Sequence, residues 1–346
     1  MIKYVKYLNP LVLYILAALA YLYTGLYCWL VPIYAYVLVP LLELTLPVNE
    51  HNMTAAEEEL AKKDVWYDYM LYIIVLLQFP TILYFLYSFT HTSISTIDVA
   101  GRIFTMGILC GTFGINVGHE LGHRKGKGEQ LLAKVSLLSS LYMHFFIEHN
   151  KGHHKHVATP QDPSSARYSE VLYLFWLRTI TYSYLDAWRI ANDDVVKKGH
   201  NKWSIHNEML QAQVIQIALL LVIYISFGAL ILLYFVLAAI IGILMLETVN
   251  YIEHYGLQRK LTSATSYERT MPQHSWNSNH PLGRVLLFEL SRHSDHHYLA
   301  SRPYQILRHH QNAPQLPTGY PGSMLLAMVP PLWFYIMHKR IALLQQ

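Results

Sequence analysis

The chain has 346 residues, of which 53% are hydrophobic and only 14% charged, and its formal net charge is +4 at pH 7. A soluble domain carries about 25% charged residues, so this composition argues against a soluble protein and favours a membrane protein. The chain shows no nucleic-acid-binding motif. We therefore attribute the small positive charge to loops between membrane spans, and we expect no nucleic-acid partner.

Six membrane spans are predicted in chain order, at about residues 7–23, 27–46, 69–89, 97–117, 209–227 and 229–249. The uncharged runs Pro10–Leu42 and Met209–Leu246 would each be roughly 50–57 Å long as one helix, whereas the hydrocarbon core is about 30 Å thick. Each run is therefore expected to form two spans, which turn near Thr24-Gly25 and near Gly228. The prediction is a single all-α domain, residues 1–346, with its spans in three hairpins.

The basic residues support this topology. Every Lys and Arg except Arg102 falls on one side of the predicted membrane, and the positive-inside rule makes that side cytoplasmic. The histidine-rich segments 118–208 and 250–346 lie on the same side, where we expect them to form a helical cap. We therefore predict a multi-pass protein of the inner (cytoplasmic) membrane whose active site faces the cytoplasm.

Nine histidines in four short boxes are the main candidates for metal ligands. Imidazole is the commonest protein metal ligand, and one tetrahedral zinc needs only three or four ligands, so nine histidines favour two metals. The spacing of the first, second and fourth boxes places ligands at i, i+3 and i+4, on one face of a helix. The candidates are His119 and His123, then His149, His153 and His154, then His254, and finally His293, His296 and His297.

Two features of the boxes leave alternatives open. The first box, His119-Glu120-Leu121-Gly122-His123, is also the HExxH signature of zinc metalloproteases, with the glutamate as general base. Histidine ligands alone do not choose between zinc, copper, iron and nickel, although nine ligands favour a redox metal. Carboxylates beside the boxes are expected to accept the distal ring N–H of ligating histidines. These are Glu120, Glu148, Asp162, Glu253, Glu289 and Asp295.

Beyond the boxes, the chain resembles the membrane-bound alkane 1-monooxygenase family of histidine-box di-iron proteins. The resemblance extends from about residue 30 to about residue 330. It is specific, because generic desaturases share the histidine boxes but not the strings NYIEHYG and LPTGYPG. The strings that carry it are NVGHELGH (116–123), HNKGHHKHVATP with DP (149–163), NYIEHYG (250–256), HSWNSNH (274–280), RHSDHH (292–297) and LPTGYPG (316–322).

The resemblance implies a reaction, cofactors and partners. Family members bind two iron ions through nine histidines, and His254 is assigned as the ninth ligand mainly on this basis. They use O2 to convert a terminal methyl group of an alkane from the lipid phase to a primary alcohol. Electrons arrive from an NAD(P)H-dependent rubredoxin reductase through rubredoxin. The chain has only Cys28 and Cys110, both in predicted spans, and no rubredoxin segment of its own.

The resemblance also bears on substrate length. In the family a bulky residue in the second span can block the far end of the substrate channel. Alignment on Pro40-Leu41-Leu42-Glu43 puts the small residue Ala35 at that position, which predicts acceptance of medium-to-long alkanes. Departures from the family pattern, such as Arg124 after the first box, remove no ligand.

Three rival functions fit parts of the sequence. A fatty-acyl desaturase or lipid hydroxylase would use the same di-iron chemistry. An HExxH membrane metalloprotease would need one zinc and Glu120 as its base. A metal transporter would need polar groups along its spans, whereas the candidate ligands here gather at one face.

Overall fold

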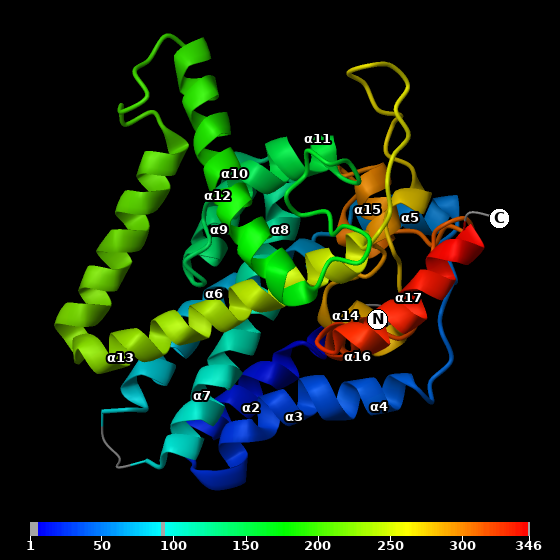
Figure 1. The fold of residues 1–346 in the computed structure, drawn as a ribbon. Helices are drawn as coiled ribbons and strands as arrows, with labels where there is room; N and C mark the ends of the chain where they lie inside the picture. Colours follow the sequence, from blue (N-terminus) through cyan, green and yellow to red (C-terminus); the bar gives the residue numbers. More distant parts are fainter. Residues whose placement is uncertain (1–5, 91–93, 345–346) are drawn as a thin grey trace. The chain divides into compact units, whose positions relative to one another are not determined.

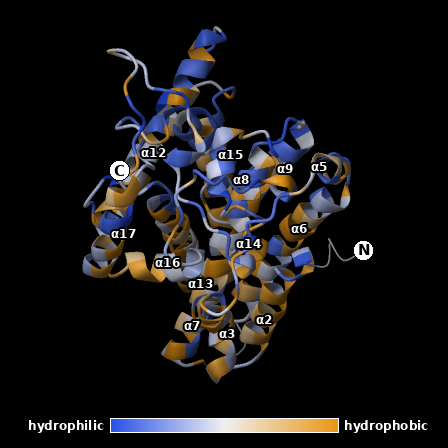
Figure 2. Ribbon diagram, turned by 90° about the vertical axis from the view of Figure 1, so that its right-hand side faces the viewer, coloured by the Kyte–Doolittle hydropathy of each residue, from blue (hydrophilic) through white to orange (hydrophobic). Residues whose placement is uncertain are grey.

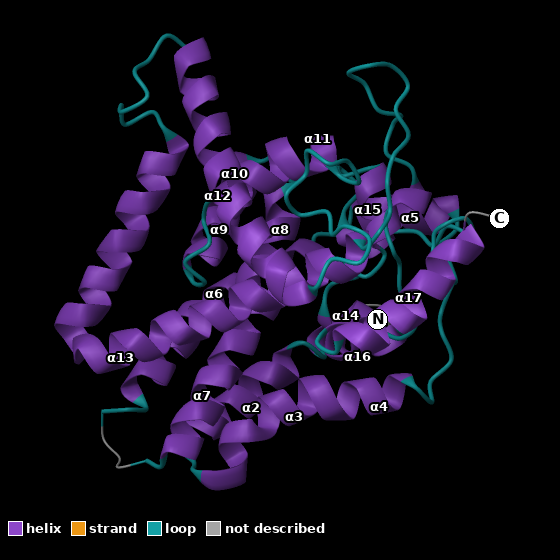
Figure 3. Ribbon diagram, viewed as in Figure 1, coloured by secondary structure: helices purple, strands orange, loops and turns teal. Residues whose placement is uncertain are grey.

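The computed structural model describes residues 6–90 and 94–344, and within these residues the chain is helical. The described part contains no β-strand, only isolated bridges between Leu261 and Tyr267 and between Asn277 and Gln315 (Figure 1; Figure 3). The predicted all-α fold is therefore confirmed.

The described residues form two compact units whose segments alternate along the chain. The first unit comprises the described parts of Met1–Tyr34, Trp66–Lys151 and Tyr184–Leu246. Its helices are η1 (Lys6–Leu8), α2 (Leu11–Leu22), η2 (Gly25–Trp29), α3 (Leu30–Ile33), α6 (Trp66–Tyr87), α7 (Thr96–Leu109), η4 (Cys110–Ile115), α8 (Asn116–Gly122), α9 (Lys127–Leu138) and α10 (Phe145–Glu148).

The second unit comprises the described parts of Ala35–Val65, Gly152–Ser183 and Glu247–Gln346. Its helices are α4 (Val39–Glu43), α5 (Ala55–Lys62), α11 (His154–His156), η6 (Pro272–His274), α14 (Pro281–Leu286), α15 (His293–Tyr298), η7 (Tyr304–Ile306), α16 (Tyr320–Ala327) and α17 (Pro330–Leu344). Four further helices contain the points where the chain passes from one unit to the other: η3 (Tyr34–Leu38), η5 (His149–His153), α12 (Leu172–Lys197) and α13 (Glu208–His254).

Four helical stretches of the described chain are long and apolar enough to cross a membrane: Gly25–Glu43, Trp66–Tyr87, Thr96–Gly122 and Glu208–His254. A fifth apolar stretch, Lys6–Leu22, is shorter. Figure 2 shows that α2, α3 and α7 are hydrophobic along most of their length, whereas α15 is hydrophilic. These stretches support a membrane protein, while the count of six spans and their pairing in hairpins stay predictions.

The helix breaks occur where the sequence predicts them. Gly25 has a φ of +71° and begins η2, immediately after α2 ends. Gly228 has a φ of +82° and interrupts the 47-residue α13. A residue with a side chain is strained at such φ values, so glycine permits each break.

Arg102, the one basic residue on the other side of the predicted membrane, binds backbone carbonyl groups at helix ends. Its side chain is buried in α7 and donates hydrogen bonds to the carbonyl oxygens of Ala20 (3.0 Å), Tyr23 (3.1 Å) and Ser88 (2.6 Å). These carbonyls lie near the ends of α2 and α6, where helices leave carbonyl groups without intrahelical partners. Arg102 therefore satisfies helix ends within the first unit.

A buried carboxylate joins α4 to α14 and to the loop before α16, all within the second unit. The Oε1 atom of Glu43 accepts a hydrogen bond of 2.6 Å from the backbone N–H of Gly283. A Cβ atom on Gly319 would lie 1.8 Å from Oε2 of Glu43, which is closer than any real contact. Gly319 belongs to the LPTGYPG string, and its lack of a side chain lets this loop pack on Glu43.

Substitution of Gly319 by alanine should therefore destabilise the protein. Overpacking of a buried site typically costs about 1–3 kcal/mol, and this clash is more severe than usual. We expect a lower thermal midpoint of the purified protein in detergent, and we expect the added substitution Glu43→Ser to restore part of the loss. Equal midpoints for Gly319→Ala and the parent protein would contradict this contact.

Candidate metal centre

Four histidines of the second unit form a compact buried cluster. They are His153 from η5, His254 at the end of α13, and His293 and His297 from α15. One ligand atom from each lies within 4.8 Å of the others. The Nε2 atoms of His153 and His297 are 3.2 Å apart, as are those of His254 and His293. We call this group the four-histidine cluster.

The second unit holds two more box histidines, His154 and His296, as a pair. Their Nε2 atoms are 3.1 Å apart and their ring centroids are 4.9 Å apart. Both rings are adjacent in sequence to members of the four-histidine cluster. The six box histidines of this unit therefore form two groups, the four-histidine cluster and the pair of His154 and His296.

The first unit holds the other three box histidines. The Nε2 atoms of His119 and His123 are 3.2 Å apart, and the centroids of their rings are 4.8 Å apart. The ring of His149 lies 4.4 Å from that of His119 and 5.2 Å from that of His123. His119 is carried by α8, which continues the apolar helix α7, and His123 is its C-terminal cap. The predicted i, i+4 pairing of the first box is thus present.

The other boxes divide differently from what their spacing predicts. His149 and His153 are four residues apart, but they belong to different histidine groups. Both lie on the π-helical turn η5, where His149 lies beside the rings of His119 and His123 and His153 lies in the four-histidine cluster. In the last box, His293 and His297 share one cluster, whereas His296 pairs with His154.

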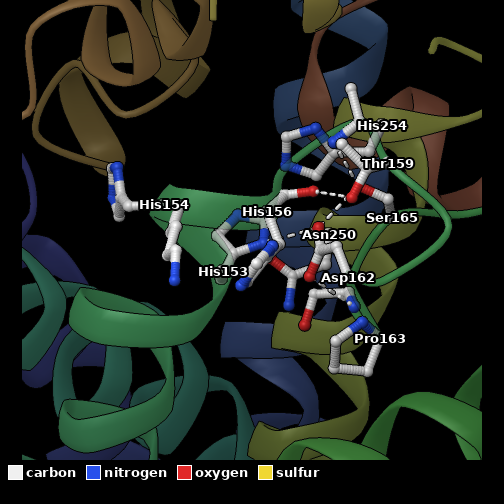
Figure 4. Close-up of polar contacts among 12 residues, drawn as sticks. His153, His154, His156, Thr159, Asp162, Pro163, Ser165, Asn250 and His254 are labelled. Atoms are coloured by element: carbon white, nitrogen blue, oxygen red, sulfur yellow. Dashed lines mark hydrogen bonds and ion pairs between the residues drawn. The ribbon is translucent and has the colours of Figure 1, made fainter. Parts of the chain in front are cut away.

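Two of the expected carboxylates contact the four-histidine cluster directly. Oδ2 of Asp162 lies 2.9 Å from Nδ1 of His153, and both side chains are buried (Figure 4). Oε2 of Glu253 lies 3.1 Å from Nε2 of His293, the nitrogen that faces His254, and not beside the distal ring nitrogen at which the carboxylates were predicted to accept. The hydroxyl groups of Ser165 and Tyr320 donate to Asp162 (2.5 Å) and Glu253 (2.7 Å), respectively. These hydroxyl groups were not predicted, although Tyr320 lies within the LPTGYPG string.

The Asp162 contact determines which nitrogen of His153 faces the cluster. A carboxylate at Nδ1 holds the ring proton there, which leaves the Nε2 lone pair free to bind a metal. Although burial raises the pKa of Asp162, its contacts with His153 and Ser165 together hold the pKa below its usual value. Asp162 is therefore a carboxylate at neutral pH, as this role requires.

The remaining carboxylates have other partners. Glu289 accepts a hydrogen bond of 2.6 Å from Arg284, and Glu120 lies 3.0 Å from Arg124. Asp295 contacts the guanidinium of Arg302, accepts from the backbone N–H of Arg308 (2.8 Å), and lies 2.7 Å from Nε2 of His310. Glu148 is buried at the end of α10. These contacts of Asp295 tie α15 to the segment that contains Arg302, Arg308 and His310.

The geometry of the cluster fits a metal ion. Nitrogen donors that share a metal with bonds of about 2.0–2.1 Å lie about 3.0–3.4 Å apart, which matches the observed separations of 3.2 Å. Burial lowers the pKa of His297 well below its usual value, and the neighbouring histidines lower it further. Neutral imidazoles with converging lone pairs repel one another unless a cation lies between them. The four-histidine cluster therefore has the donor set of a metal site.

His144 lies outside these histidine groups, and its burial should make the stability of the protein depend on pH. Its ring contacts those of Tyr142 (4.4 Å) and Tyr184 (5.2 Å), and burial lowers its pKa from 6.5 to about 4. In the unfolded chain His144 becomes protonated below about pH 6.5, whereas in the folded chain it becomes protonated only near pH 4. This histidine therefore removes stability as the pH falls through that window, by up to about 1.4 kcal/mol per pH unit.

The variant His144→Phe is expected to show a smaller loss of thermal midpoint between pH 7 and pH 5 than the parent protein does. The measurement is the difference between the two proteins across this range, in the same detergent. Exposed His200→Phe serves as the control and should leave the pH dependence unchanged. Parallel curves for His144→Phe and the parent would show that His144 titrates normally.

The chain is similar to known proteins along most of its length. Residues 99–326 match the family model described as fatty acid desaturase. The chain is 38% identical to an alkane 1-monooxygenase of Acinetobacter baylyi, over 90% of this chain and 76% of that protein. It is 38% identical to one from Pseudomonas putida, over 90% and 77%, and 37% identical to one from Alcanivorax borkumensis, over 92% and 79%. With this identity along most of its length, the chain belongs to the alkane 1-monooxygenase family.

Proposed function

We propose that this chain hydroxylates the terminal methyl group of alkanes, with O2 as co-substrate and two iron ions held by its nine box histidines. The balanced reaction is R–CH3 + O2 + 2 electrons + 2 protons → R–CH2OH + H2O. The observation that carries the proposal is the buried four-histidine cluster, with Asp162 on His153. It lies in a chain similar to curated alkane 1-monooxygenases.

The ligands divide into two sets in this proposal. One iron would be held by His153, His254, His293 and His297, whose Nε2 atoms lie 3.2 Å apart in the pairs His153–His297 and His254–His293. The other five box histidines complete the predicted set of nine ligands. Bound iron would supply the redox chemistry that activates O2, which the imidazole side chains alone cannot supply.

The protein side chains around the site have three roles. Asp162 holds the His153 proton on Nδ1, and Tyr320 and Ser165 orient the two carboxylates that contact the cluster. The site is dry, since the exposed fraction of each histidine of the four-histidine cluster is 2% or less except for His297, at 6%. Exclusion of water protects a reaction at a strong C–H bond from side reactions.

The membrane context completes the proposal. The alkane would enter from the lipid phase, six spans would enclose its path, and the metal site would face the cytoplasm of a bacterial inner membrane. Electrons would come from rubredoxin and an NAD(P)H-dependent reductase. The apolar helices and the distribution of Lys and Arg support this orientation.

The decisive experiment combines metal analysis with product analysis. Purified protein with rubredoxin, reductase, NADH and O2 should contain about two irons per chain and should form 1-alkanols from an alkane panel. Conversion of acyl substrates to unsaturated products would favour the desaturase alternative. About one zinc, no iron and peptide cleavage lost in Glu120→Ala would instead favour the metalloprotease.

Substrate length offers a separate test at Ala35. This residue is half-buried on the π-helical turn η3, within the apolar stretch Gly25–Glu43. If the side chain faces the substrate channel, Ala35→Trp should shorten the longest alkane accepted while leaving the rate on short alkanes within about threefold. The product profile across chain lengths is the measurement, and Val37→Trp, at an exposed position on the same turn, is the control.

A further inference from the structure

The protein needs an external source of electrons that reaches the metal site. Cys28 and Cys110 are buried within apolar helices, away from the histidine boxes in the sequence, and are not positioned to relay electrons from the surface. Each turnover nevertheless consumes two electrons. A redox partner must therefore dock where the protein surface comes close to the histidines.

A hairpin of the second unit brings cations to such a place. Residues 257–271 form an extended loop closed by the bridge between Leu261 and Tyr267, which projects from this unit (Figure 1). The backbone N–H of Arg259 donates to the carbonyl oxygen of Ala158 (2.8 Å), and its guanidinium donates to the carbonyl oxygen of Lys155 (2.9 Å). The base of the hairpin is thus fixed to the segment that directly follows His153 and His154.

The C-terminal side of the hairpin contacts a residue that directly follows the last histidine box. The guanidinium of Arg269 lies 5.1 Å from the ring centroid of Tyr298, in a cation–π contact. Tyr298 follows His296 and His297 directly and ends α15. The exposed cation Arg269 therefore contacts the residue that directly follows two box histidines in the sequence.

The residues around these contacts include several cations. Lys155, Lys260 and Arg269 are exposed and Arg259 is half-buried. The hairpin carboxylate Glu268 accepts a hydrogen bond from the backbone N–H of Lys260 (2.8 Å) and lies 3.3 Å from Nε2 of His274. Leu261 is 62% exposed and Leu299 is 41% exposed. We call the residues Lys155, Arg259, Lys260, Leu261, Arg269 and Leu299 the hairpin surface.

We propose that the hairpin surface is the docking site of a small acidic one-electron iron–sulfur protein, which delivers electrons past Tyr298 to the metal site. The inference rests on the proposed function, because it assigns the entry point of the two electrons of that reaction. Each docked partner is oxidised by one electron, so two docking events, with two protons from solvent, complete one turnover. Exposed positive charge with nearby apolar side chains suits a brief, salt-sensitive encounter with an acidic partner.

The test is the rate at which the iron-loaded enzyme oxidises reduced rubredoxin, measured by stopped flow at low and high ionic strength. The variant Lys260→Glu/Arg269→Glu should lower the second-order rate constant at least about tenfold at low ionic strength and should flatten its salt dependence. The matched control is Lys197→Glu/Lys198→Glu, which reverses two exposed lysines at the end of α12. The control should change the rate constant less than about twofold.

A second measurement separates docking from chemistry. Enzyme reduced chemically with dithionite and a small mediator should give the same yield of alcohol per chain from both charge-reversal variants and the parent protein. Equal rubredoxin rates for the hairpin variant and the control variant would overturn the docking site. Absence of alcohol from the chemically reduced parent protein would instead overturn the proposed function.

Discussion

Replacement of His254 by alanine is expected to lower the iron content from about two to about one per chain and to lower alkane hydroxylation more than about 100-fold. His254 is fully buried, and its Nε2 lies 3.2 Å from that of His293. Its ring is also 4.9 Å from that of His153 and 5.0 Å from that of His297. Its removal leaves three donors and a cavity where a fourth converges.

The matched control for this experiment is His280→Ala. His280 belongs to the HSWNSNH string of the same unit, but it is half-buried, contacts Ser278, and lies outside the four-histidine cluster. This variant should keep about two irons per chain and most of the activity. Iron analysis by inductively coupled plasma spectrometry and alcohol yield are the two measurements. Retention of two irons in His254→Ala would remove His254 from the ligand set.

The sequence was sufficient to predict the helical architecture because long uncharged runs have few alternatives in a membrane protein. The breaks at Gly25 and Gly228 were predictable from the length of a hydrocarbon core, and both glycines have positive φ values. The pairing of His119 with His123 was also predictable, because their helix continues directly from an apolar run.

The division of the other boxes was not predictable from spacing. His149 and His153 lie on one short turn, yet the first lies beside the ring of His119 and the second lies in the four-histidine cluster, and no local sequence rule assigns them to different groups. The separation of His296 from His293 and His297 depends on tertiary contacts with His154. His254 was expected mainly from family resemblance, and its position in the four-histidine cluster now gives it geometric support.

Contacts between residues distant in sequence were likewise beyond sequence reasoning. Glu43 meets Gly283 and Gly319 across more than 200 residues, and Tyr320 meets Glu253 across 67 residues. Asp295 was expected to accept an N–H from a ligating ring, whereas its contacts in the structure are Arg302, Arg308 and His310. Whether Asp295 affects the metal through these contacts is open to experiment.

The variant Asp295→Asn is expected to lower the free energy of unfolding by about 3–5 kcal/mol, because it leaves the largely buried guanidinium of Arg302 without its counter-charge. The side chain of Asp295 has no exposed area, and that of Arg302 is only 10% exposed. Contacts with His310, Arg308 and Arg302 hold the pKa of Asp295 below its usual value although burial raises it. A neutral amide at this position cannot replace the carboxylate charge.

The same substitution should also speed the loss of iron, and this readout separates a positioning role from a purely structural one. Asp295 lies between His293 and His296 on α15, so loosening its contacts should let both rings move. We expect chelator-driven iron release several-fold faster at a temperature well below the unfolding midpoint. The control Glu59→Gln breaks an exposed ion pair with Lys62 and should change neither measurement, because solvent screens such pairs. A lowered midpoint with unchanged iron release would confine Asp295 to stabilising the fold, since α15 would then hold its histidines without this carboxylate.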